Sequence, residues 1–597
     1  MSTYEARLAA LREQLKADRL EGFVVPLTDE HMSEYVGSYA QRLAWLTGFQ
    51  GSAGSAAVLP EEAAIFVDGR YTLQVRDQVD GRHWSYQSVP ETSVAEWLKA
   101  HAPDGGRIGY DPWLHTKDWV ARATAALAEK GAELVAVQRN PIDAVWADKP
   151  EPSKARLVVH PDSFTGKSSA AKRQEMADWL REQKADAAVL SALDSIAWTF
   201  NVRGQDVEHT PVALSFALVN EDGTADLFVA SEKIGDDVRQ HLGNGVRIHE
   251  RHEFEPHLRG LAGRTVVADP ERAVHAIFEA LEKAGAKIVQ KRDPAVLPKA
   301  IKNRSEIEGH RAAQARDGAA LSRFLHWLSI EAPKGNVDEL IAVEKLQQFR
   351  LACGDLRDTS FDTISGAGPN GAIVHYRVSE ETNRKLEMDS IYLVDSGGQY
   401  PDGTTDVTRT VAIGTPTAEM RDRFTRVLKG HIAVARAVFP EGTRGGQLDS
   451  FARQYLWQAG LDYAHGTGHG VGAYLAVHEG PQRISPAGSS QAGGDEPLQA
   501  GMFLSNEPGY YKAGEYGIRV ENLVLVERRV VEGAEKAMLG FETLTFAPID
   551  RNLIEVGMLS AEERDWLNAY HARVLEVVGP QLEDEAKAWL EAGCAPL

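Results

Sequence analysis

The chain has few cysteines, no long apolar run and no surplus of positive charge. Cys353 and Cys594 are the only cysteines in 597 residues, which excludes a disulfide framework and agrees with a reducing compartment. No apolar run approaches the roughly 20 residues that span a bilayer. The 86 acidic residues outnumber the 65 basic ones, and the net charge of −21 argues against nucleic acid and anionic membranes as partners. Because residues 1–7 begin a charged amphipathic helix rather than a signal peptide, we expect a cytoplasmic protein.

The length and an internal repeat predict several domains. At 597 residues the chain exceeds one ordinary core, so about two to four domains are expected. A helical pattern that ends at residues 11–14 runs into a strand at 22–25, and the pattern that ends at 180–183 does the same before 187–190. The segments that follow also correspond, since 43–45 matches 196–198. We therefore expect two related α/β domains ahead of a third domain.

The expected breaks fall in segments of linker composition. Residues 148–153 are rich in proline and charge, and a second break is expected near 298–305. A long helix is then predicted over residues 306–329, at the start of the last domain. The predicted domains are residues 1–149, 150–303 and 304–597.

The last domain carries two strand-like segments that end on acids and then return. The apolar run 390–394 ends on Asp395, residues 398–403 form a turn, and the returning strand begins at Asp406. The same arrangement recurs at residues 504–523, where it presents Glu507 and Glu521. The pattern predicts two β-hairpins, each with two carboxylates.

Four carboxylates placed together would raise one another's pKa values and destabilise the fold unless cations bind between them. His469, in the glycine-rich segment 465–472, offers a neutral nitrogen ligand from a third segment. Oxygen donors with one imidazole suit a pair of hard divalent cations such as Mn²⁺ better than a lone structural zinc. Any single one of these acids is more simply explained as a solvated loop charge, but that explanation fails for the whole set.

In these motifs the chain resembles the pita-bread metallopeptidases (M24B), and within them the long, three-domain Xaa-Pro aminopeptidases, also called aminopeptidase P. The resemblance is carried by residues 395–400, 403–410, 465–472, 477–481, 506–511 and 517–522, and upstream by 68–71, 197–204 and 370–376. It covers nearly the whole chain. It implies an α/β (α+β) protein in which two creatinase-like α/β domains precede a pita-bread metallopeptidase catalytic domain with a C-terminal extension.

The resemblance also implies the roles of individual residues. Asp395 would hold one divalent metal, His469 and Glu507 the other, and Asp406 and Glu521 would bridge the two, with Mn²⁺ expected in both places. Glu507 would also act as general base toward the attacking water. His375 and His478 would face the substrate, steady the developing oxyanion and move protons.

Other residues carry alternatives. His375, judged by its neighbours alone, is better explained as a partly buried histidine with satisfied partners, until the Asn-Gly-Ala turn before it is considered, and similar reasoning applies to His478. Arg519, two residues before Glu521, is expected to pair with the acids and to face the substrate, the alternative being a surface charge. His465 and Tyr511 either contact the substrate or the carboxylates, or they pack with a polar tip.

Arg70 and Trp457 are harder to assign. By the same resemblance Arg70 would reach toward the peptide from the N-terminal domain or from a neighbouring subunit, unless it is a surface arginine at a turn. For Trp457 we expect packing in the core, the alternatives being a dimer contact or the peptide groove.

The implied reaction is release of the N-terminal residue from peptides with proline at the second position, by a homodimer. A preference for proline enters through the resemblance alone. An Xaa-Pro dipeptidase (prolidase) would use the same five ligands, but the two domains ahead of the catalytic one favour the aminopeptidase. The third alternative is a non-catalytic peptide-binding pita-bread protein. Such a protein would be expected to lack several of these ligands.

Overall fold

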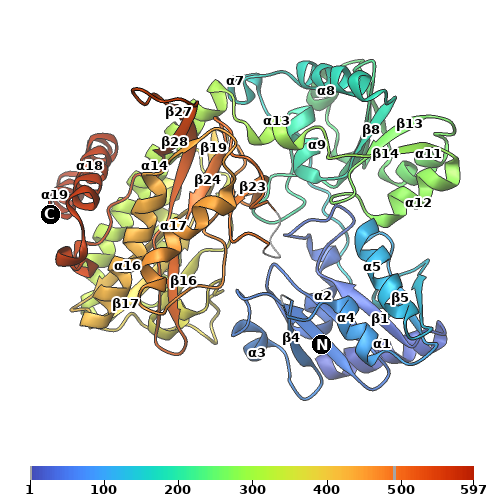
Figure 1. Ribbon diagram of the computed structural model, residues 1–597, viewed down its shortest axis with the longest axis horizontal. Helices are drawn as coiled ribbons and strands as arrows, with labels where there is room; N and C mark the ends of the chain where they lie inside the picture. The colour runs from blue at the N-terminus through green and yellow to red at the C-terminus, as the bar shows by residue number, and fades with distance from the viewer. Residues whose placement is uncertain (1–2, 90, 489–492) are drawn as a thin grey trace. The chain divides into compact units, whose positions relative to one another are not determined.

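The computed structural model describes residues 3–89, 91–488 and 493–597. The chain divides into two compact units, Met1–Val296 and Leu297–Leu597 (Figure 1). Within the described residues, no helix combines the length and apolar character that crossing a bilayer requires.

The N-terminal unit contains two six-stranded sheets. The first has the strand order β4-β3-β2-β1-β5-β6. Its strands are β1 Gly22–Pro26, β2 Ser55–Val58, β3 Ala63–Val67, β4 Ser85–Ser88, β5 Arg107–Tyr110 and β6 Glu133–Ala136. Its helices are α1 Tyr4–Ala17, α2 Arg42–Thr47, α3 Gln74–Gln78, α4 Val94–His101, α5 Lys117–Ala128 and α6 Pro141–Val145.

The second sheet has the order β12-β11-β10-β8-β13-β14. Its strands are β8 Ala187–Leu190, β10 Ser215–Asn220, β11 Ala225–Val229, β12 Val246–His249, β13 Thr265–Ala268 and β14 Lys287–Gln290. The helices around it are α7 Asp162–Thr165, α8 Ser169–Gln183, α9 Leu193–Phe200, α10 Asp236–Leu242, α11 Phe254–Arg259 and α12 His275–Ala284, and the short strands β7 Val158–Val159 and β9 Val202–Arg203 pair beside them.

The two sheets repeat one topology. β1 pairs antiparallel with β2 and parallel with β5, and β8 pairs antiparallel with β10 and parallel with β13. Each of these central strands follows a long helix, α1 or α8, as the sequence repeat predicts. The predicted repeat of two α/β domains is therefore confirmed, whereas the boundary at residue 149 stays a prediction.

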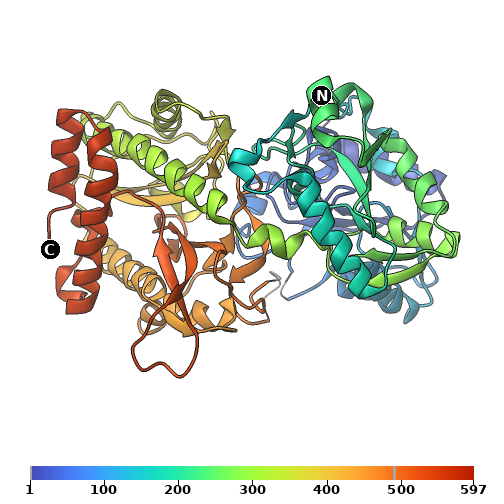
Figure 2. The ribbon, with the colours of Figure 1, turned by 90° about the horizontal axis from the view of Figure 1, so that it is seen from above.

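The C-terminal unit pairs its helices over smaller sheets. The long helix α14 (Arg304–Glu331; Figures 1 and 2) contacts α15 (Glu339–Ala352), and α16 (Ala418–Ala435) contacts α17 (Gly445–Trp457). The first helix pair accompanies the sheet β16-β17-β20, and the second accompanies the sheet β21-β28-β27-β24-β22-β23. This twofold repetition of helix pair and sheet is the pita-bread arrangement.

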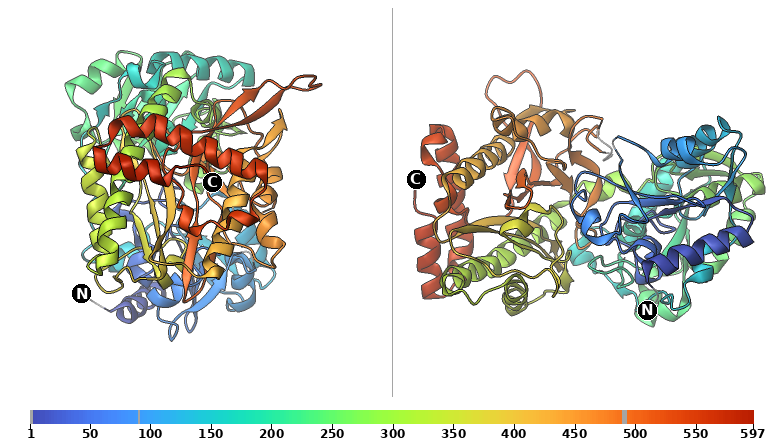
Figure 3. Two further views of the ribbon diagram at one scale, coloured as in Figure 1. Left: turned by 90° about the vertical axis from the view of Figure 1, so that its left-hand side faces the viewer. Right: turned by 90° about the horizontal axis from the view of Figure 1, so that it is seen from below.

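The strands of this unit are short and largely buried. Their bounds are β15 Asp358–Thr359, β16 Ile364–Ala367, β17 Ser390–Ser396, β18 Gly398–Tyr400, β19 Gly403–Thr404, β20 Val407–Ile413, β21 Val438–Pro440, β22 Gly468–Gly470, β23 Glu479–Ile484, β24 Phe503–Asn506, β25 Gly509–Lys512, β26 Tyr516–Arg519, β27 Asn522–Arg529 and β28 Met538–Thr543. The helices α13 Val296–Ala300, α18 Ala561–Val578 and α19 Asp584–Gly593 complete the unit. Figure 3 shows α18 and α19 beside one another, and both contact α14.

Local sequence explains where α14 begins. The Asn303 side chain accepts hydrogen bonds from the backbone N–H groups of Ser305 and Glu306, and the Glu306 carboxylate accepts one from the backbone N–H of Asn303. This capping box satisfies donors that have no partner inside the helix. The helix predicted over residues 306–329 is thereby confirmed.

The expectation for Trp457 is wrong. Its side chain is 49% exposed at the end of α17. The buried positions of this helix include Leu448, Ala452 and Leu456, which recur every four residues on one face. Trp457 follows Leu456 directly and is rotated by about 100° from it around the helix axis, so it points away from that face.

Candidate metal centre

The first predicted hairpin brings two aspartates to the same end of a strand pair. β17 and β20 are antiparallel, with Asp395 opposite Thr408, and Asp406 lies one residue before β20 begins. Between them β18 and β19 pair with each other and turn the chain around. The apolar run before Asp395 is buried, and Asp395 and Asp406 are themselves buried. The hairpin prediction is confirmed.

The second predicted hairpin has the same arrangement, except that each of its two strands is interrupted once. β24 pairs with β27 and β25 pairs with β26, both antiparallel, and Glu507 and Glu521 lie at the breaks between these ladders. The backbone N–H of Glu521 donates to the carbonyl oxygen of Thr408 at 3.2 Å, which joins the second hairpin to the first. Four carboxylates from distant parts of the sequence therefore converge.

The glycine-rich segment lets His469 approach this cluster. A Cβ atom on Gly468 would lie 1.9 Å from the carbonyl oxygen of Ser505, so only glycine allows β22 to lie this close to β24. The Nδ1 atom of His469 lies 2.9 Å from the carbonyl oxygen of Gly470. Because a carbonyl can only accept, Nδ1 carries the proton and the lone pair of Nε2 is left for a ligand.

The donor atoms lie at metal-binding separations. His469 Nε2 is 3.4 Å from Asp406 Oδ2 and 3.5 Å from Glu507 Oε1. One donor atom from each of Asp406, His469 and Glu521 lies within 4.8 Å of the other two. Glu507 is the most accessible of these groups, with 18% of its side chain exposed.

Burial and mutual repulsion dominate the electrostatics of the cluster. Burial, followed by the negative charge of Asp395, raises the pKa of Asp406 well above its ordinary value. Burial, followed by the charges of Asp406 and Asp395, does the same to the pKa of Glu521. Burial also raises the pKa of Glu507, against the opposing effect of His469. Without added positive charge, these groups resist being ionised together.

Arg519 supplies positive charge at one side of the cluster. Its Nη2 donates to Asp395 Oδ2 at 2.7 Å, and its Nε donates to the hydroxyl of Thr408 at 3.2 Å. The Thr408 hydroxyl in turn donates to Glu521 Oε2 at 2.7 Å. The predicted pairing of Arg519 with the acids is confirmed, and its alternative as a surface charge is wrong because the side chain is buried.

Tyr511 and His465 continue this chain of contacts. Arg519 Nη1 donates to the Tyr511 hydroxyl at 2.6 Å, and His465 Nε2 lies 2.8 Å from the same oxygen. Burial raises the pKa of Tyr511 to about 12, against the lowering effect of Arg519. Tyr511 is thus linked to the acid cluster through Arg519, and His465 through Tyr511, whereas the expected contacts of these two residues with the substrate or the carboxylates stay predictions.

The donor set fits divalent cations. Asp395 Oδ1 is buried and has no hydrogen-bond partner among the described residues, although Oδ2 of the same carboxylate is paired with Arg519. A buried carboxylate oxygen without a partner is costly, and a cation is the usual remedy. Four carboxylates with one imidazole form a hard donor set that favours Mn²⁺-like ions.

His478 lies against His469 of the cluster. Its ring centroid is 4.3 Å from that of His469, at an interplanar angle of 72°. The next residue, Glu479, is buried and accepts hydrogen bonds from Lys299 Nζ, at 2.9 Å, and from Lys302 Nζ. Two lysines thus hold the backbone on which His478 is mounted.

His375 is half-buried and lies just beyond the turn 368–372. A Cβ atom on Gly517 would lie 1.7 Å from the carbonyl oxygen of Gly371, so this turn lies directly against β26. The buried carboxylate of Glu339 accepts from Asn370 Nδ2 at 2.9 Å and from the Tyr376 hydroxyl at 2.9 Å. These contacts fix the backbone on both sides of His375.

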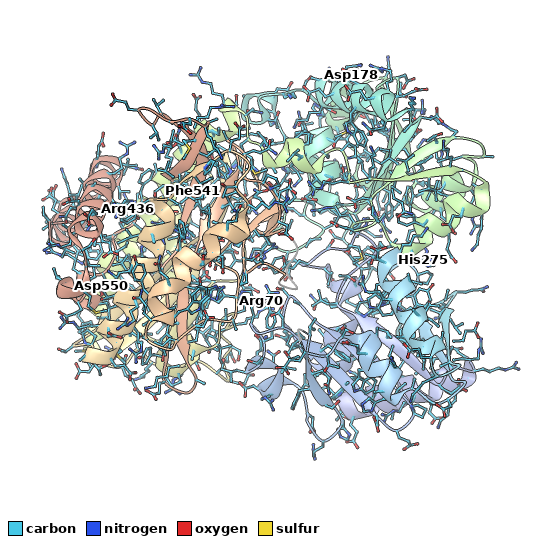
Figure 4. The ribbon with its side chains drawn as sticks, in the orientation of Figure 1. Arg70, Asp178, His275, Arg436, Phe541 and Asp550 are labelled. Atoms are coloured by element: carbon cyan, nitrogen blue, oxygen red, sulfur yellow. The ribbon has the colours of Figure 1, made fainter. Side chains whose placement is uncertain are left out.

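Arg70 lies in the N-terminal unit (Figure 4). Its guanidinium pairs with Asp68, with Nη2 2.7 Å from Oδ2 and Nε 3.0 Å from Oδ1, and lies 3.9 Å from Glu34. The expectation that it reaches toward a peptide stays a prediction.

A cavity of about 470 Å³ lies elsewhere on the C-terminal unit. Arg436 and Phe541, both labelled in Figure 4, line it together with Trp566. None of the predicted site residues belongs to its lining. The five expected metal ligands and Arg519 gather instead at the acid cluster.

Some residues that shape the centre were not predicted. Sequence reasoning missed Glu339, His431, Lys299, Lys302 and the roles of Asn506 and Asn522. The two asparagines lie next to the glutamates in the motifs, which is a usable signal. Glu339 and the two lysines lie more than a hundred residues before the motif that contains Glu507. His431 lies in an ordinary helical segment.

Comparison with known families agrees with the fold and the acid cluster. Metallopeptidase family M24 matches residues 308–528, and the C-terminal region of peptidase M24 matches 537–597. Creatinase/Prolidase N-terminal domains match residues 7–145 and 148–306. The chain belongs to metallopeptidase family M24.

Whole-chain relatives narrow this assignment. A probable Xaa-Pro aminopeptidase P of Laccaria bicolor is 42% identical over 99% of this chain and 93% of its own length. Aminopeptidase P2 of Arabidopsis thaliana is 40% identical over 97% of this chain and 86% of its own length. The crystal structure of X-prolyl aminopeptidase from Caenorhabditis elegans, described as a cytosolic enzyme with a di-nuclear active site, matches with a TM-score of 0.95 and 35% identity over the full length of both chains. Within family M24, the chain is one of the Xaa-Pro aminopeptidase P proteins.

Proposed function

We propose that this protein is a metal-dependent aminopeptidase that releases the N-terminal residue from peptides with proline at the second position. The observation that carries the proposal is the convergence of Asp406, His469 and Glu521 within 4.8 Å, beside Asp395 and Glu507. The full-length likeness to Xaa-Pro aminopeptidases supports the substrate class.

Two divalent cations would be held by five residues. Asp395 would hold one, His469 and Glu507 the other, and Asp406 and Glu521 would lie between the two. The carboxylate-rich donor set favours Mn²⁺ as the resident ion. When bound, such a pair supplies Lewis acidity and lowers the pKa of the attacking water.

The chain's own residues then move the protons. Glu507 is the most accessible carboxylate of the cluster, so it is placed to accept a proton from the attacking water and to pass it to the departing prolyl nitrogen. His478, packed on His469, and His375 would face the peptide and donate hydrogen bonds to the developing oxyanion. Arg519 holds Asp395 in place and would also face the substrate.

The remaining expectations concern the surroundings of the site. A peptide bond to proline has a tertiary nitrogen and no N–H, so the site must accept a rigid ring without relying on a backbone donor. His465 would line the substrate side through its contact with Tyr511, and Arg70 would bind the peptide from the N-terminal domain. A homodimer in the cytoplasm, acting on peptides and binding neither nucleic acid nor membrane, completes the proposal.

Substrate length tests this function. The purified protein, loaded with Mn²⁺, is incubated with an Xaa-Pro dipeptide, an Xaa-Pro-Yaa tripeptide and a longer Xaa-Pro peptide, and the released residue is measured. We expect cleavage of the tripeptide and of the longer peptide. Cleavage of the dipeptide alone would identify a prolidase instead, and cleavage of none with metal bound would favour a peptide-binding protein.

A further inference from the structure

Two asparagines lie directly behind the glutamates of the centre. Asn506 precedes Glu507, Asn522 follows Glu521, and the two asparagines are opposite one another in the β24–β27 ladder. Successive side chains of a strand point to opposite faces, so Asn506 and Asn522 face away from the carboxylates and into the protein. Both are fully buried.

One histidine joins these two strands. His431, fully buried on α16, has Nδ1 at 3.0 Å from the carbonyl oxygen of Asn506 and Nε2 at 3.1 Å from Asn522 Nδ2. Asn506 returns the contact, since its Nδ2 donates to the carbonyl oxygen of His431 at 2.9 Å. A single imidazole thus spans the segments that carry Glu507 and Glu521.

The direction of every hydrogen bond in this bridge is determined by its partners. The carbonyl of Asn506 can only accept, so Nδ1 of His431 donates and Nε2 is left as an acceptor. Nε2 therefore requires a donor, and the amide nitrogen of Asn522 supplies it. Burial, followed by the charge of Arg409, lowers the pKa of His431 to about 3 against the raising effect of the backbone groups of Asn506 and Val520, so the ring stays neutral.

Arg409 and Tyr570 hold the far side of Asn522. Arg409 Nη2 donates to Asn522 Oδ1 at 2.8 Å and to the Tyr570 hydroxyl at 2.8 Å, and its Nη1 donates to the backbone carbonyl oxygen of Glu521 at 2.6 Å. Because an arginine can only donate, Oδ1 of Asn522 must face it and Nδ2 must face His431. Both hydrogen-bonding groups of the Asn522 side chain are thereby used.

Helix α18 contributes the remaining members of this network. The Tyr570 ring on α18 stacks on Trp566 with centroids 5.4 Å apart, and Trp566 in turn packs edge-on against His431 at 6.0 Å. The Tyr570 hydroxyl donates to the carbonyl oxygen of Ala547 at 2.7 Å. Helix α18 therefore covers the side of the two strands opposite the carboxylates.

We propose that His431 is a positioning residue of the metal centre, which fixes the spacing of the Glu507 and Glu521 segments through Asn506 and Asn522, with Arg409 and Tyr570 holding Asn522 in register. This proposal rests on the proposed function, because it assigns Glu507 and Glu521 to metal binding. His431 does not touch metal or substrate. It acts through the backbone and side chains on which the two carboxylates are mounted.

Metal affinity provides the test. Metal-free wild-type protein, His431→Leu and His431→Gln are titrated with Mn²⁺ by calorimetry, and the visible absorption of Co²⁺ bound to each is recorded. Leucine leaves the partners of the imidazole unpaired, whereas glutamine offers a donor and an acceptor on one side chain. We expect His431→Leu to weaken Mn²⁺ binding by about 10- to 100-fold and to alter the Co²⁺ spectrum, with His431→Gln lying nearer the wild type.

His115 provides the control. It is also a buried imidazole, but it lies in the N-terminal unit, where its Nδ1 is 2.9 Å from the backbone carbonyl oxygen of Asp111. His115→Leu should lower the melting temperature and leave the Mn²⁺ affinity and the Co²⁺ spectrum close to those of the wild type. An unchanged affinity and spectrum in His431→Leu would overturn the proposal, as would equal metal loss in His115→Leu.

Further variants keep the question decidable. If His431→Leu does not fold, Tyr570→Phe tests the proposal instead, because it removes only the hydroxyl between Arg409 and Asn522. A clear loss of Mn²⁺ affinity in this variant supports the network, and an unchanged affinity contradicts it. Wild-type protein that binds no Mn²⁺ would instead contradict the proposed function. Failure of the positioning role and failure of the proposed function are thereby distinguished.

Discussion

Two buried ion pairs of the N-terminal unit and the acid cluster of the C-terminal unit differ in how their charge is balanced. In the N-terminal unit, the buried Lys233 lies against the buried Asp206, and Arg42 meets Asp143 through two hydrogen bonds of 2.8 Å. At the acid cluster of the C-terminal unit, Arg519 neutralises Asp395, yet the pKa values of Asp406 and Glu521 remain well above ordinary. A buried charge with an oppositely charged partner belongs to the fold, whereas a cluster of like buried charges without enough partners indicates a site for a charged ligand.

Removing a carboxylate from the cluster should have the largest effect. Asp406→Ala takes away a group expected to lie between both cations, so turnover should fall by about 10,000-fold or more and bound metal should be lost. The chain should stay folded, because one source of repulsion in the metal-free site disappears. Steady-state kinetics, elemental analysis and circular dichroism measure the three outcomes. Wild-type rates in this variant would remove Asp406 from the centre, and the same holds for Glu507→Ala.

A neighbour of the cluster should separate chemistry from metal binding. His478→Ala removes a ring that packs on His469 but is not an expected ligand, so activity should fall by about 100- to 10,000-fold while metal content stays near that of the wild type. Elemental analysis beside kcat and KM provides the comparison. Loss of metal in this variant would place His478 among the ligands.

In the N-terminal unit, breaking a buried pair should affect stability alone. Lys233→Met leaves the Asp206 carboxylate buried without its cation, which should cost about 3–5 kcal/mol in the free energy of unfolding. Lys99→Ala, which removes an exposed partner of Glu129 in the same unit, is the matched control and should cost less than about 1 kcal/mol. Urea unfolding gives both values. Altered metal content in Lys233→Met would contradict the division between paired and excess charge.

The smallest expected effect is a change in how stability depends on pH. The pKa of Glu521 is raised in the folded, metal-free protein, so the folded state keeps a proton that the unfolded state has already released. The contribution of Glu521 to stability should therefore be greatest below the ordinary carboxyl pKa of 4.5 and fall as pH rises toward the elevated value. Glu521→Gln has no proton to lose, so its stability should fall less as pH rises. Across the titration, the difference in unfolding free energy should be about 1.4 kcal/mol for each unit by which the pKa of Glu521 is raised.

Urea unfolding of chelator-treated protein between pH 5 and 8 would reveal that slope. Mn²⁺ should abolish it in the wild type, because the cation favours the ionised carboxylates. Parallel pH profiles for the wild type and Glu521→Gln would mean that Glu521 is not held in a repulsive cluster.

The acid-bearing hairpins could be predicted because their signals are local. An apolar run that ends on Asp395, a turn and a returning strand specify a hairpin without reference to the rest of the chain. The network around His431 could not be predicted in this way. Its members come from segments separated by up to 161 residues, and a histidine in an amphipathic helix has no pattern of its own.

Two further cases show where sequence reasoning succeeds and fails. The pairing of Arg519 with the acids follows from its two-residue spacing from Glu521, since such residues share a face of a strand. The prediction that Trp457 is buried was wrong, because aromatic character indicates burial only when the residue lies on the buried face of its helix. Leu456 lies on that face of α17 and its neighbour does not.

The contact of Tyr570 with Arg409 has a consequence for how the protein is made. A ribosome delivers the chain from its amino terminus, so all five expected ligands are synthesised before Tyr570, which completes the support behind Asn522. A nascent chain that ends before α18 should therefore capture Mn²⁺ more weakly than the finished protein, and ribosome-bound chains arrested at that point can be assayed for it. Equal capture by such chains would show that α18 and α19 are dispensable for metal binding, whereas weaker capture would make maturation of the enzyme a late, post-translational event.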